Sequence, residues 1–299
     1  LVGAQVVGAD RVVVHAQPAD SPPSITLTNF RQVLELTSAE ARQHRPVEAR
    51  AVVTLVEPAS KLLFFQDATA GIFVDNQGRN SIVVGPGANA LLSAEFIEAQ
   101  HAAIAGAAVT LAQLESPLET VAVALRLAHE AGRIAMLNPA PANVALPREL
   151  LALADILTPN ETECAGLFAR HLGERIDGEA IASLDSPRLH ALCRALLPGG
   201  TVVVTLGAAG CFVSHPDNAT RGDDSAWYRL SAEPATPIDT TGAGDAFNGA
   251  LAAALALRPG APFAMHLREA NRYAALSTER PGAALSMPDR DALAARFPD

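Results

Sequence analysis

The segment Asp239–Gly249, DTTGAGDAFNG, has the residue types needed to bind and transfer a phosphate group. Gly242, Ala243 and Gly244 are small residues at the entrance to a long apolar run, where backbone N–H groups can approach a ligand closely. The free N–H groups of a first helical turn, with the positive end of the helix dipole, make an anion site. Asp245 falls in that turn and is placed to accept a proton from an attacking hydroxyl. For these residues alone, a glycine-rich turn with an ordinary first-turn aspartate is the alternative.

The elements that must position this segment alternate regularly from about residue 80 onward. Short apolar or β-branched runs predict strands, and longer runs with helical spacing predict helices. The predicted strands are 81–85, 109–113, 134–137, 155–157 and 201–205. The predicted helices are 93–105, 117–131, 161–172, 187–197, 242–257 and 262–277. This alternation predicts an α/β fold with a mainly parallel sheet, whose ligands bind beyond the carboxyl ends of the strands.

Residues 1–78 do not follow this pattern and predict a separate β-rich segment. Val12–Ala16 is compatible with the tail of a secretory leader, cleaved after Val14-His15-Ala16, and equally with a strand. Residues 17–26 have the composition of a linker. This first segment is therefore expected to differ in origin from residues 79–299.

A β-hairpin and a third strand are predicted inside that first segment. Residues 50–56 and 62–66 flank a Glu-Pro-Ala-Ser turn, and a turn at 67–71 leads to Ile72–Val74. Residues 27–75 as a whole resemble part of a small OB-like β-barrel found ahead of bacterial sensor proteins. The resemblance stops before a barrel could close, which predicts a partial OB-like unit.

Composition excludes several classes of protein. The chain is 49% hydrophobic and 18% charged, which is typical of a globular protein with a sizeable core. Its net charge of −10 disfavours binding to nucleic acid, and no apolar run is long enough to predict a membrane span. The three cysteines have irregular spacing that matches neither a metal site nor a disulfide framework. They predict buried thiols and a cytoplasmic protein.

The string DTTGAGDAFNGALAAALA resembles the C-terminal signature of the ribokinase-like (PfkB) carbohydrate kinases. Six further strings resemble motifs of that family in the same order. They are NSIVVGPGANALLS, QLESPLETV, LNPAPA, DILTPNETE, VVVTLGAAG and LSTERPGAALSMP. The resemblance covers residues 78–299. It implies a three-layer ribokinase-like fold in which residues 79–299 are the nucleotide-binding and catalytic domain, with the N-terminal part of the fold replaced by the small β-rich segment.

The resemblance assigns roles to individual residues. Asp245 matches the base that deprotonates the primary hydroxyl of the sugar, and Gly242, Ala243 and Gly244 match the anion hole around the γ-phosphate. Glu115 matches a carboxylate that binds the sugar together with Asp245, although an exposed charge at a strand end is equally common. The implied nucleotide-binding residues are Asn160, Thr205, Gly207, Gly210 and Asn271.

Two metal sites are also implied by the resemblance. Glu163 belongs with Asn160 to an N-x-x-E motif that organises Mg²⁺ through water, which suits an ion that keeps several of its waters. A helix cap after Pro159 is the bland interpretation of the same two residues, and the two roles are compatible. The residues that match a K⁺ loop are Asp239, Thr241, Ser277, Arg280, Gly282 and Ser286.

The implied activity is ATP-dependent phosphorylation of a pentose, first of all D-ribose to D-ribose 5-phosphate, with ATP, Mg²⁺ and K⁺. The implied partners are small molecules, and a homodimer is left open because the family often dimerises through a lid that this sequence lacks. The sequence also lacks the family's Gly-Gly-Lys-Gly-Ala-Asn-type sugar loop, since its one Gly-Gly pair is Gly199-Gly200. The alternative is therefore a catalytically impaired nucleotide-binding half-fold, fused to a sensor-type segment. A nucleoside or fructose kinase is a weaker third interpretation.

Overall fold

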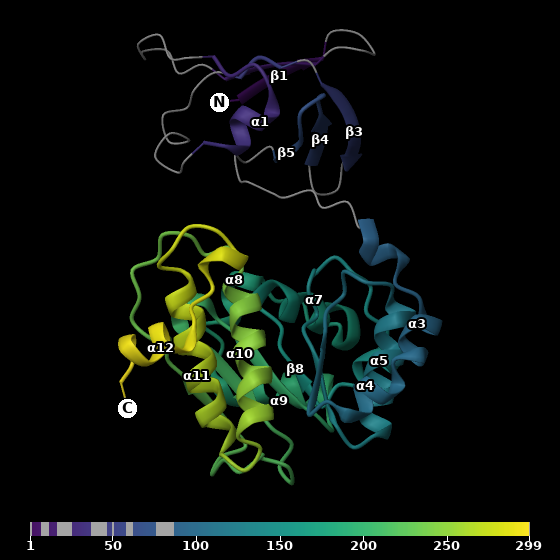
Figure 1. The fold of residues 1–299 in the computed structure, drawn as a ribbon, viewed down its shortest axis with the longest axis vertical. Helices are drawn as coiled ribbons and strands as arrows, with labels where there is room; N and C mark the ends of the chain where they lie inside the picture. The colour runs from purple at the N-terminus through teal and green to yellow at the C-terminus, as the bar shows by residue number, and fades with distance from the viewer. Residues whose placement is uncertain are drawn as a thin grey trace. The chain divides into compact units, whose positions relative to one another are not determined.

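The chain forms two compact units, residues 1–85 and 86–299, which are described separately. The computed structural model describes residues 2–6, 12–16, 26–36, 47–49, 51–57, 62–75 and 87–298. The predicted strand at 81–85 and all of the predicted linker except Thr26 lie outside these residues. Figure 1 shows the elements of each unit.

The first unit is β-rich, as predicted. β1 (Val2–Val6) pairs antiparallel with β2 (Val12–Ala16), so the latter segment is a strand. β3 (Val52–Glu57), β4 (Leu62–Gln66) and β5 (Gly71–Asp75) form a three-stranded antiparallel meander. The predicted hairpin and third strand are thereby confirmed.

A short helix, α1 (Phe30–Leu34), is attached to the turn between β4 and β5 through Asp67. One Asp67 carboxylate oxygen accepts from Phe30 N at 2.7 Å, and the other accepts from Thr69 N, Thr69 Oγ1 and Ala70 N at 2.6, 2.7 and 2.8 Å. Partial burial raises the pKa of Asp67, but these hydrogen bonds from Thr69, Phe30 and Ala70 outweigh it and lower the pKa to about 2. The carboxylate thus fixes the predicted turn.

The second unit is built on a six-stranded sheet in the order β11-β10-β9-β8-β7-β6. The parallel strands are β6 (Val109–Ala112), β7 (Ile134–Leu137), β8 (Ile156–Leu157) and β9 (Thr201–Thr205). Two antiparallel strands, β10 (Cys211–Ser214) and β11 (Trp227–Leu230), complete one edge and were not predicted. The predicted mainly parallel sheet is confirmed.

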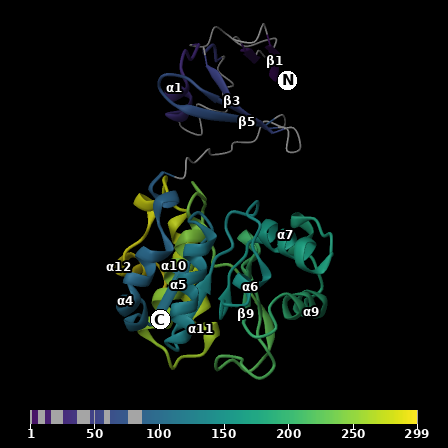
Figure 2. The same ribbon diagram turned by 90° about the vertical axis from the view of Figure 1, so that its right-hand side faces the viewer.

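Helices cover both faces of this sheet. Their bounds are α3 (Ala94–Ala99), α4 (His101–Gly106), α5 (Leu118–Glu130), α6 (Arg148–Leu151), α7 (Glu161–Leu172), α8 (Gly178–Ile181), α9 (Ser186–Leu196), α10 (Ala243–Leu257), α11 (Phe263–Ser277) and α12 (Arg290–Arg296), with 3₁₀ turns η1 (Gly87–Leu91), η2 (Gly207–Ala209) and η3 (Ala284–Ser286). In Figure 2, α7 and α9 lie on one side of β9, and α10 and α11 on the other. None of the described helices has the length and apolar character needed to cross a membrane.

The prediction of a single helix over 93–105 is wrong, because the structure has two shorter helices there, α3 and α4. Ser93 caps α3 as expected, because its hydroxyl accepts from Phe96 N at 3.2 Å. The chain then leaves helical geometry at Gln100, whose ψ is 12°, and α4 starts at the next residue. Gln100 therefore ends one helix and begins the other.

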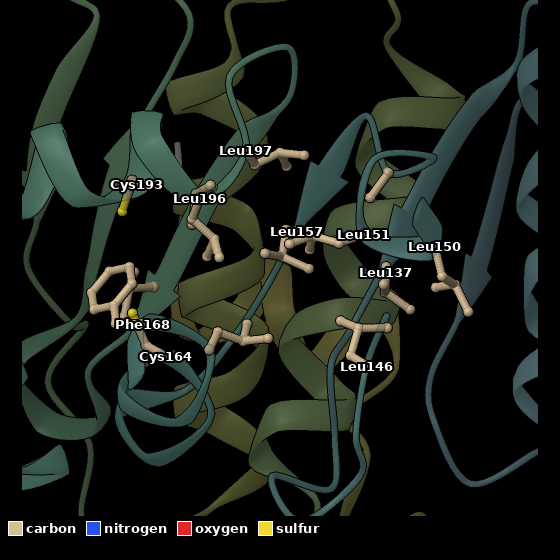
Figure 3. Close-up of a cluster of buried hydrophobic side chains, with 14 of the residues drawn as sticks. Leu137, Leu146, Leu150, Leu151, Leu157, Cys164, Phe168, Cys193, Leu196 and Leu197 are labelled. Carbon is tan, nitrogen blue, oxygen red and sulfur yellow. The ribbon is translucent and has the colours of Figure 1, made fainter. Parts of the chain in front are cut away.

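Alternate residues of the parallel strands face opposite layers, which defines the three-layer fold. Met136, Ile156 and Val203 pack against α10 and α11. Their neighbours Leu137 and Leu157 pack on the other side with residues of α5, α6, α7 and α9 (Figure 3). This period of two is expected for strands buried on both faces. The three cysteines are free and buried, as predicted, and burial raises the pKa of Cys193 and Cys211 to about 12.

Candidate active site

The start of α10 is shaped by Gly242, which adopts a left-handed conformation with φ of 79°. A Cβ at this position would also lie 3.2 Å from Ala283 Cβ and 3.4 Å from Met287 Cε. Both conformation and space therefore favour glycine. No side chain caps the first turn of α10. Ala243 N donates to Thr240 O at 3.2 Å, but the N–H groups of Gly244 and Asp245 have no such acceptor within the described residues and are available to an anion.

Asp245 lies in this uncapped first turn and is exposed. Within the described residues, no group hydrogen-bonds or ion-pairs with its carboxylate. Gly244, the residue before it, is also exposed and has open space around its Cα. A free carboxylate beside free N–H groups can take up a proton next to a bound phosphate.

The predicted cation loop is assembled from two segments that Asp239 joins. Its carboxylate accepts from Thr241 N and from Gly282 N, both at 2.9 Å. Ile238 N and Asp239 N both donate to Thr278 O, at 2.7 and 3.1 Å. Hydrogen bonds from Gly282 and Thr241 lower the pKa of Asp239, so the carboxylate stays charged and keeps the two segments together.

The other residues of that predicted loop are placed differently from one another. Ser277 and Ser286 are buried, and their hydroxyls donate to Ala274 O and Ala283 O at 2.8 and 2.7 Å. Arg280 is exposed. The described residues contain no cluster of three His, Cys, Asp or Glu side chains that could hold a metal ion. The loop instead offers carbonyl, hydroxyl and carboxylate oxygens, a donor set that fits a hard monovalent cation.

Asn160 and Glu163 form a capping box at the start of α7, so the predicted cap is confirmed. Glu163 N donates to Asn160 Oδ1 at 2.9 Å, while Asn160 N and Nδ2 donate to the two Glu163 carboxylate oxygens at 2.9 and 3.0 Å. Burial raises the pKa of Glu163, opposed by the bond from Asn160 N. Both oxygens are thus already engaged, which suits a carboxylate that acts on Mg²⁺ through water rather than as a direct ligand.

The capping box lies beside the end of β9. An isolated parallel bridge pairs Asn160 with Thr205, and Thr205 N donates to Pro159 O at 2.9 Å. The two predicted nucleotide-binding residues are therefore neighbours. Glu115 follows β6 at the same carboxyl edge of the sheet, but it is exposed and, within the described residues, its hydrogen bonds are with Gln113 alone.

The segment after β9 that carries the proposed nucleotide-binding glycines forms a tight 3₁₀ turn. Gly207 has φ of 51° and Gly210 has φ of 90°. A Cβ at Gly210 would lie 2.0 Å from Leu230 O, so this glycine is required for close packing against the end of β11. Asn271, buried on α11, donates to Ser231 O at 3.4 Å and contacts the same segment.

A buried polar cluster that was not predicted lies at the opposite end of the sheet. His215 Nδ1 contacts Thr201 Oγ1 at 3.0 Å, and His215 Nε2 contacts an Asp223 carboxylate oxygen at 3.2 Å. Tyr228 OH donates to the same Asp223 oxygen. Burial lowers the pKa of His215, although the hydrogen bond and the negative charge of Asp223 act to raise it. The hydrogen bonds of this cluster hold the connection between β10 and β11 against the start of β9, away from the candidate site.

Comparison with known proteins agrees with the fold. Residues 66–290 match the model of the pfkB family carbohydrate kinases, and the chain belongs to this family. It is 36% identical to the ribokinase of Haemophilus influenzae over 221 residues, covering 74% of this chain and 66% of that protein. It is 34% identical to the ribokinase of Mus musculus over 223 residues, covering 74% and 64% of the two chains.

Solved structures support the same assignment. A ribokinase from Thermotoga maritima is 31% identical with a TM-score of 0.58, covering 74% of this chain and 66% of that one. A ribokinase from Arabidopsis thaliana, complexed with ribose and ATP, is 28% identical with a TM-score of 0.62 over the same shares. The chain thus spans slightly less than two thirds of the length of these ribokinases.

Proposed function

We propose that this chain transfers the γ-phosphate of ATP to a hydroxyl of a pentose, with D-ribose as the first candidate. The observation that carries the proposal is the Asp245 carboxylate in the first turn of α10, which has no partner within the part of the chain that the structure describes. The similarity to ribokinases, including one complexed with ribose and ATP, supports the choice of substrates.

In this proposal Asp245 is the general base. It takes the proton of the pentose hydroxyl as that oxygen forms its bond to the γ-phosphorus, and the bond from phosphorus to the β-phosphate oxygen breaks, which releases ADP. The backbone N–H groups that follow Gly242 stabilise the charge on the transferred phosphoryl group. Phosphoryl transfer depends mainly on such positioning and charge stabilisation, so these few groups supply much of what the chemistry needs.

The proposed nucleotide site extends along the carboxyl edge of the sheet. Asn160 and Thr205 are neighbours there, and Gly207 and Gly210 shape the turn that follows. Asn271 holds the segment on which that turn packs. Glu163 would organise Mg²⁺ through water, and that ion would neutralise charge on the phosphates.

A monovalent cation such as K⁺ would fit the loop joined by Asp239. The oxygens of Thr241, Ser277, Gly282 and Ser286 would hold it. Arg280 would contribute its backbone carbonyl, since its side chain is exposed. Because a Cβ at Gly242 would contact Ala283, this loop packs directly against the start of α10. A cation there would stabilise the first turn in the conformation that binds phosphate.

Glu115 and Asp245 are the two proposed contacts with the sugar. A sugar has several hydroxyls, and a buried polar group left without a partner costs about 1–3 kcal/mol. Because the sequence has no Gly-Gly-Lys-Gly-Ala-Asn-type loop, we expect weak binding of pentose. The same fact favours the second candidate, a nucleotide-binding half-fold with impaired catalysis.

A coupled ADP-release assay with ATP, Mg²⁺, K⁺ and a panel of pentoses separates the two candidates. We expect ADP release that rises with millimolar D-ribose and depends on Asp245. ADP release at the same rate in the presence and in the absence of each pentose would support the impaired half-fold instead. Replacing K⁺ by Na⁺ in the same assay tests the proposed cation loop.

A further inference from the structure

Asn248 is a buried amide in the otherwise apolar inner face of α10, and it is not one of the residues proposed to contact nucleotide, sugar or metal. It is 5% exposed and lies among Ala246, Phe247 and Leu251, which are also buried. Its Nδ2 donates to the carbonyl oxygen of Gly244 at 3.0 Å. That acceptor fixes the orientation of the amide, because a flipped amide would set two oxygens against each other.

The Gly244 carbonyl belongs to the same peptide group as the N–H of Asp245. This group is planar, so holding its oxygen also holds its N–H in one direction. A hydrogen bond at the oxygen polarises the amide and strengthens the N–H as a donor. The Asp245 N–H lies in the uncapped first turn of α10, where the proposed function places the transferred phosphate.

The other half of the Asn248 amide shows that stability alone does not explain this residue. Its Oδ1 is buried and has no hydrogen-bond partner within the described residues. A buried acceptor without a partner is unfavourable, and an apolar side chain of the same size would avoid that cost. Groups that oppose stability in this way are concentrated at functional sites.

We infer that Asn248 is a positioning residue, which orients and polarises the 244–245 peptide group so that the Asp245 N–H binds the γ-phosphate. The inference rests on the proposed function for the identity of the ligand. The orientation and polarisation of the peptide group are inferred from the hydrogen bond between Asn248 Nδ2 and Gly244 O alone. Asn248 contacts neither phosphate nor sugar in this scheme, and acts through the backbone.

The test compares Asn248→Leu with Asn248→Val, two apolar side chains that each remove the donor without adding a charge. Thr120→Val is the matched control, because Thr120 is a buried residue of α5 whose hydroxyl donates to Leu92 O at 2.7 Å. Calorimetry measures the affinity of each protein for ADP and for the β,γ-imido analogue of ATP, with Mg²⁺. NMR of the ligand-free proteins measures the amide proton shift of Asp245.

We expect both Asn248 variants to lose about tenfold in affinity for the ATP analogue, the scale of one weakened hydrogen bond to a charged group, with ADP affinity unchanged. The Asp245 amide proton should move upfield in both, and Asn248→Leu should melt no lower than the wild type. Thr120→Val should lower the melting temperature. It should leave unchanged both the selectivity, which is the ratio of the affinities for the ATP analogue and for ADP, and the amide proton shift of Asp245. Wild-type selectivity and an unmoved Asp245 amide in both Asn248 variants would overturn the inference.

The calorimetry and the NMR measurement together distinguish a failure of this inference from a failure of the proposed function. A wild-type chain that binds neither nucleotide would contradict the proposed function, and the Asp245 amide shift would then decide alone whether Asn248 controls the peptide group. A shift that moves without any change in selectivity would overturn the link to the γ-phosphate.

Discussion

Asp239 and Asp245 lie in one segment of the chain but have opposite surroundings. Both oxygens of Asp239 accept backbone N–H groups, and its pKa is lowered, whereas the Asp245 carboxylate has no partner within the described residues. A carboxylate whose oxygens are already bonded favours its charged form and is a poor proton acceptor. The contrast favours Asp245 as the base and Asp239 as the structural residue.

Asp245→Asn should therefore remove pentose-dependent turnover while nucleotide binding persists. The amide keeps the size of the carboxylate but cannot take up the proton, and loss of a positioned general base costs about 10²–10⁴-fold in rate. ADP-release kinetics and calorimetry with ATP on the same sample check both parts. A variant with undiminished turnover would show that another group is the base.

Asp67 should make the first unit sensitive to acid. Its folded-state pKa of about 2 lies below the ordinary value of 3.8, so its stabilising effect is complete above about pH 4 and is lost as the pH falls through about 2. Asp67→Asn should remove most of this dependence and speed hydrogen exchange at the amides of Thr69 and Ala70.

Hydrogen exchange between pH 2 and pH 5, followed by mass spectrometry, measures this effect. The chain's one tryptophan, Trp227, belongs to the second unit, so its fluorescence reports that unit independently. We expect that signal to be equal in the wild type and in Asp67→Asn. Equal exchange at residues 67–70 in the two proteins would refute the proposed role of Asp67.

At the scale of elements, two glycines at the start of α10 have different roles. Gly242 has φ of 79° and close neighbours, whereas Gly244 is helical with open space. Gly242→Ala should lower stability by about 1–2 kcal/mol from the left-handed conformation, and crowding against Ala283 adds to this. Gly244→Ala should raise it by about 0.5–1 kcal/mol. Thermal unfolding of the pair checks the contrast, and equal shifts in one direction would contradict it.

The elements that position the site were largely predictable, because each has a strong local signal. Residues 134–137, 161–172 and 201–205 form elements with the predicted bounds. The strands β10 and β11 were missed because they are short, and the connection between them is fixed by contacts of Asp223 with His215 and Tyr228 that no local pattern contains. The break at Gln100 likewise has no proline or glycine beside it.

The residues of the candidate site were proposed from sequence motifs, but their hydrogen-bond partners could not be predicted in the same way. The capping role of Asn160 followed from its place before a helix. The bridge from Asn160 to Thr205 and the bond from Asp239 to Gly282 depend on the tertiary fold. Asn248 had one signal in the sequence, a polar residue inside an apolar helix one turn after Asp245, but its hydrogen bond to Gly244 O is visible only in the structure.

At the scale of the whole molecule, the proposed nucleotide contacts all lie at or after Asn160, whereas Glu115 and Asp245 are the two proposed contacts with the sugar. Nucleotide affinity should therefore exceed pentose affinity by a wide margin. Titration of D-ribose into protein saturated with the β,γ-imido analogue of ATP measures this. We expect a dissociation constant above about 1 mM, which corresponds to about −4.1 kcal/mol. Sub-millimolar binding would show that other residues rebuild the sugar site.

The most direct test of the proposed function is phosphorus NMR of the reaction products. The protein is incubated with ATP, Mg²⁺, K⁺ and an excess of D-ribose, beside a matched sample of Asp245→Asn. We expect a phosphomonoester signal of pentose 5-phosphate that grows together with ADP in the wild type and is absent from the variant. Growth of inorganic phosphate and ADP alone, at a rate independent of ribose, would contradict the transfer of phosphate to a pentose.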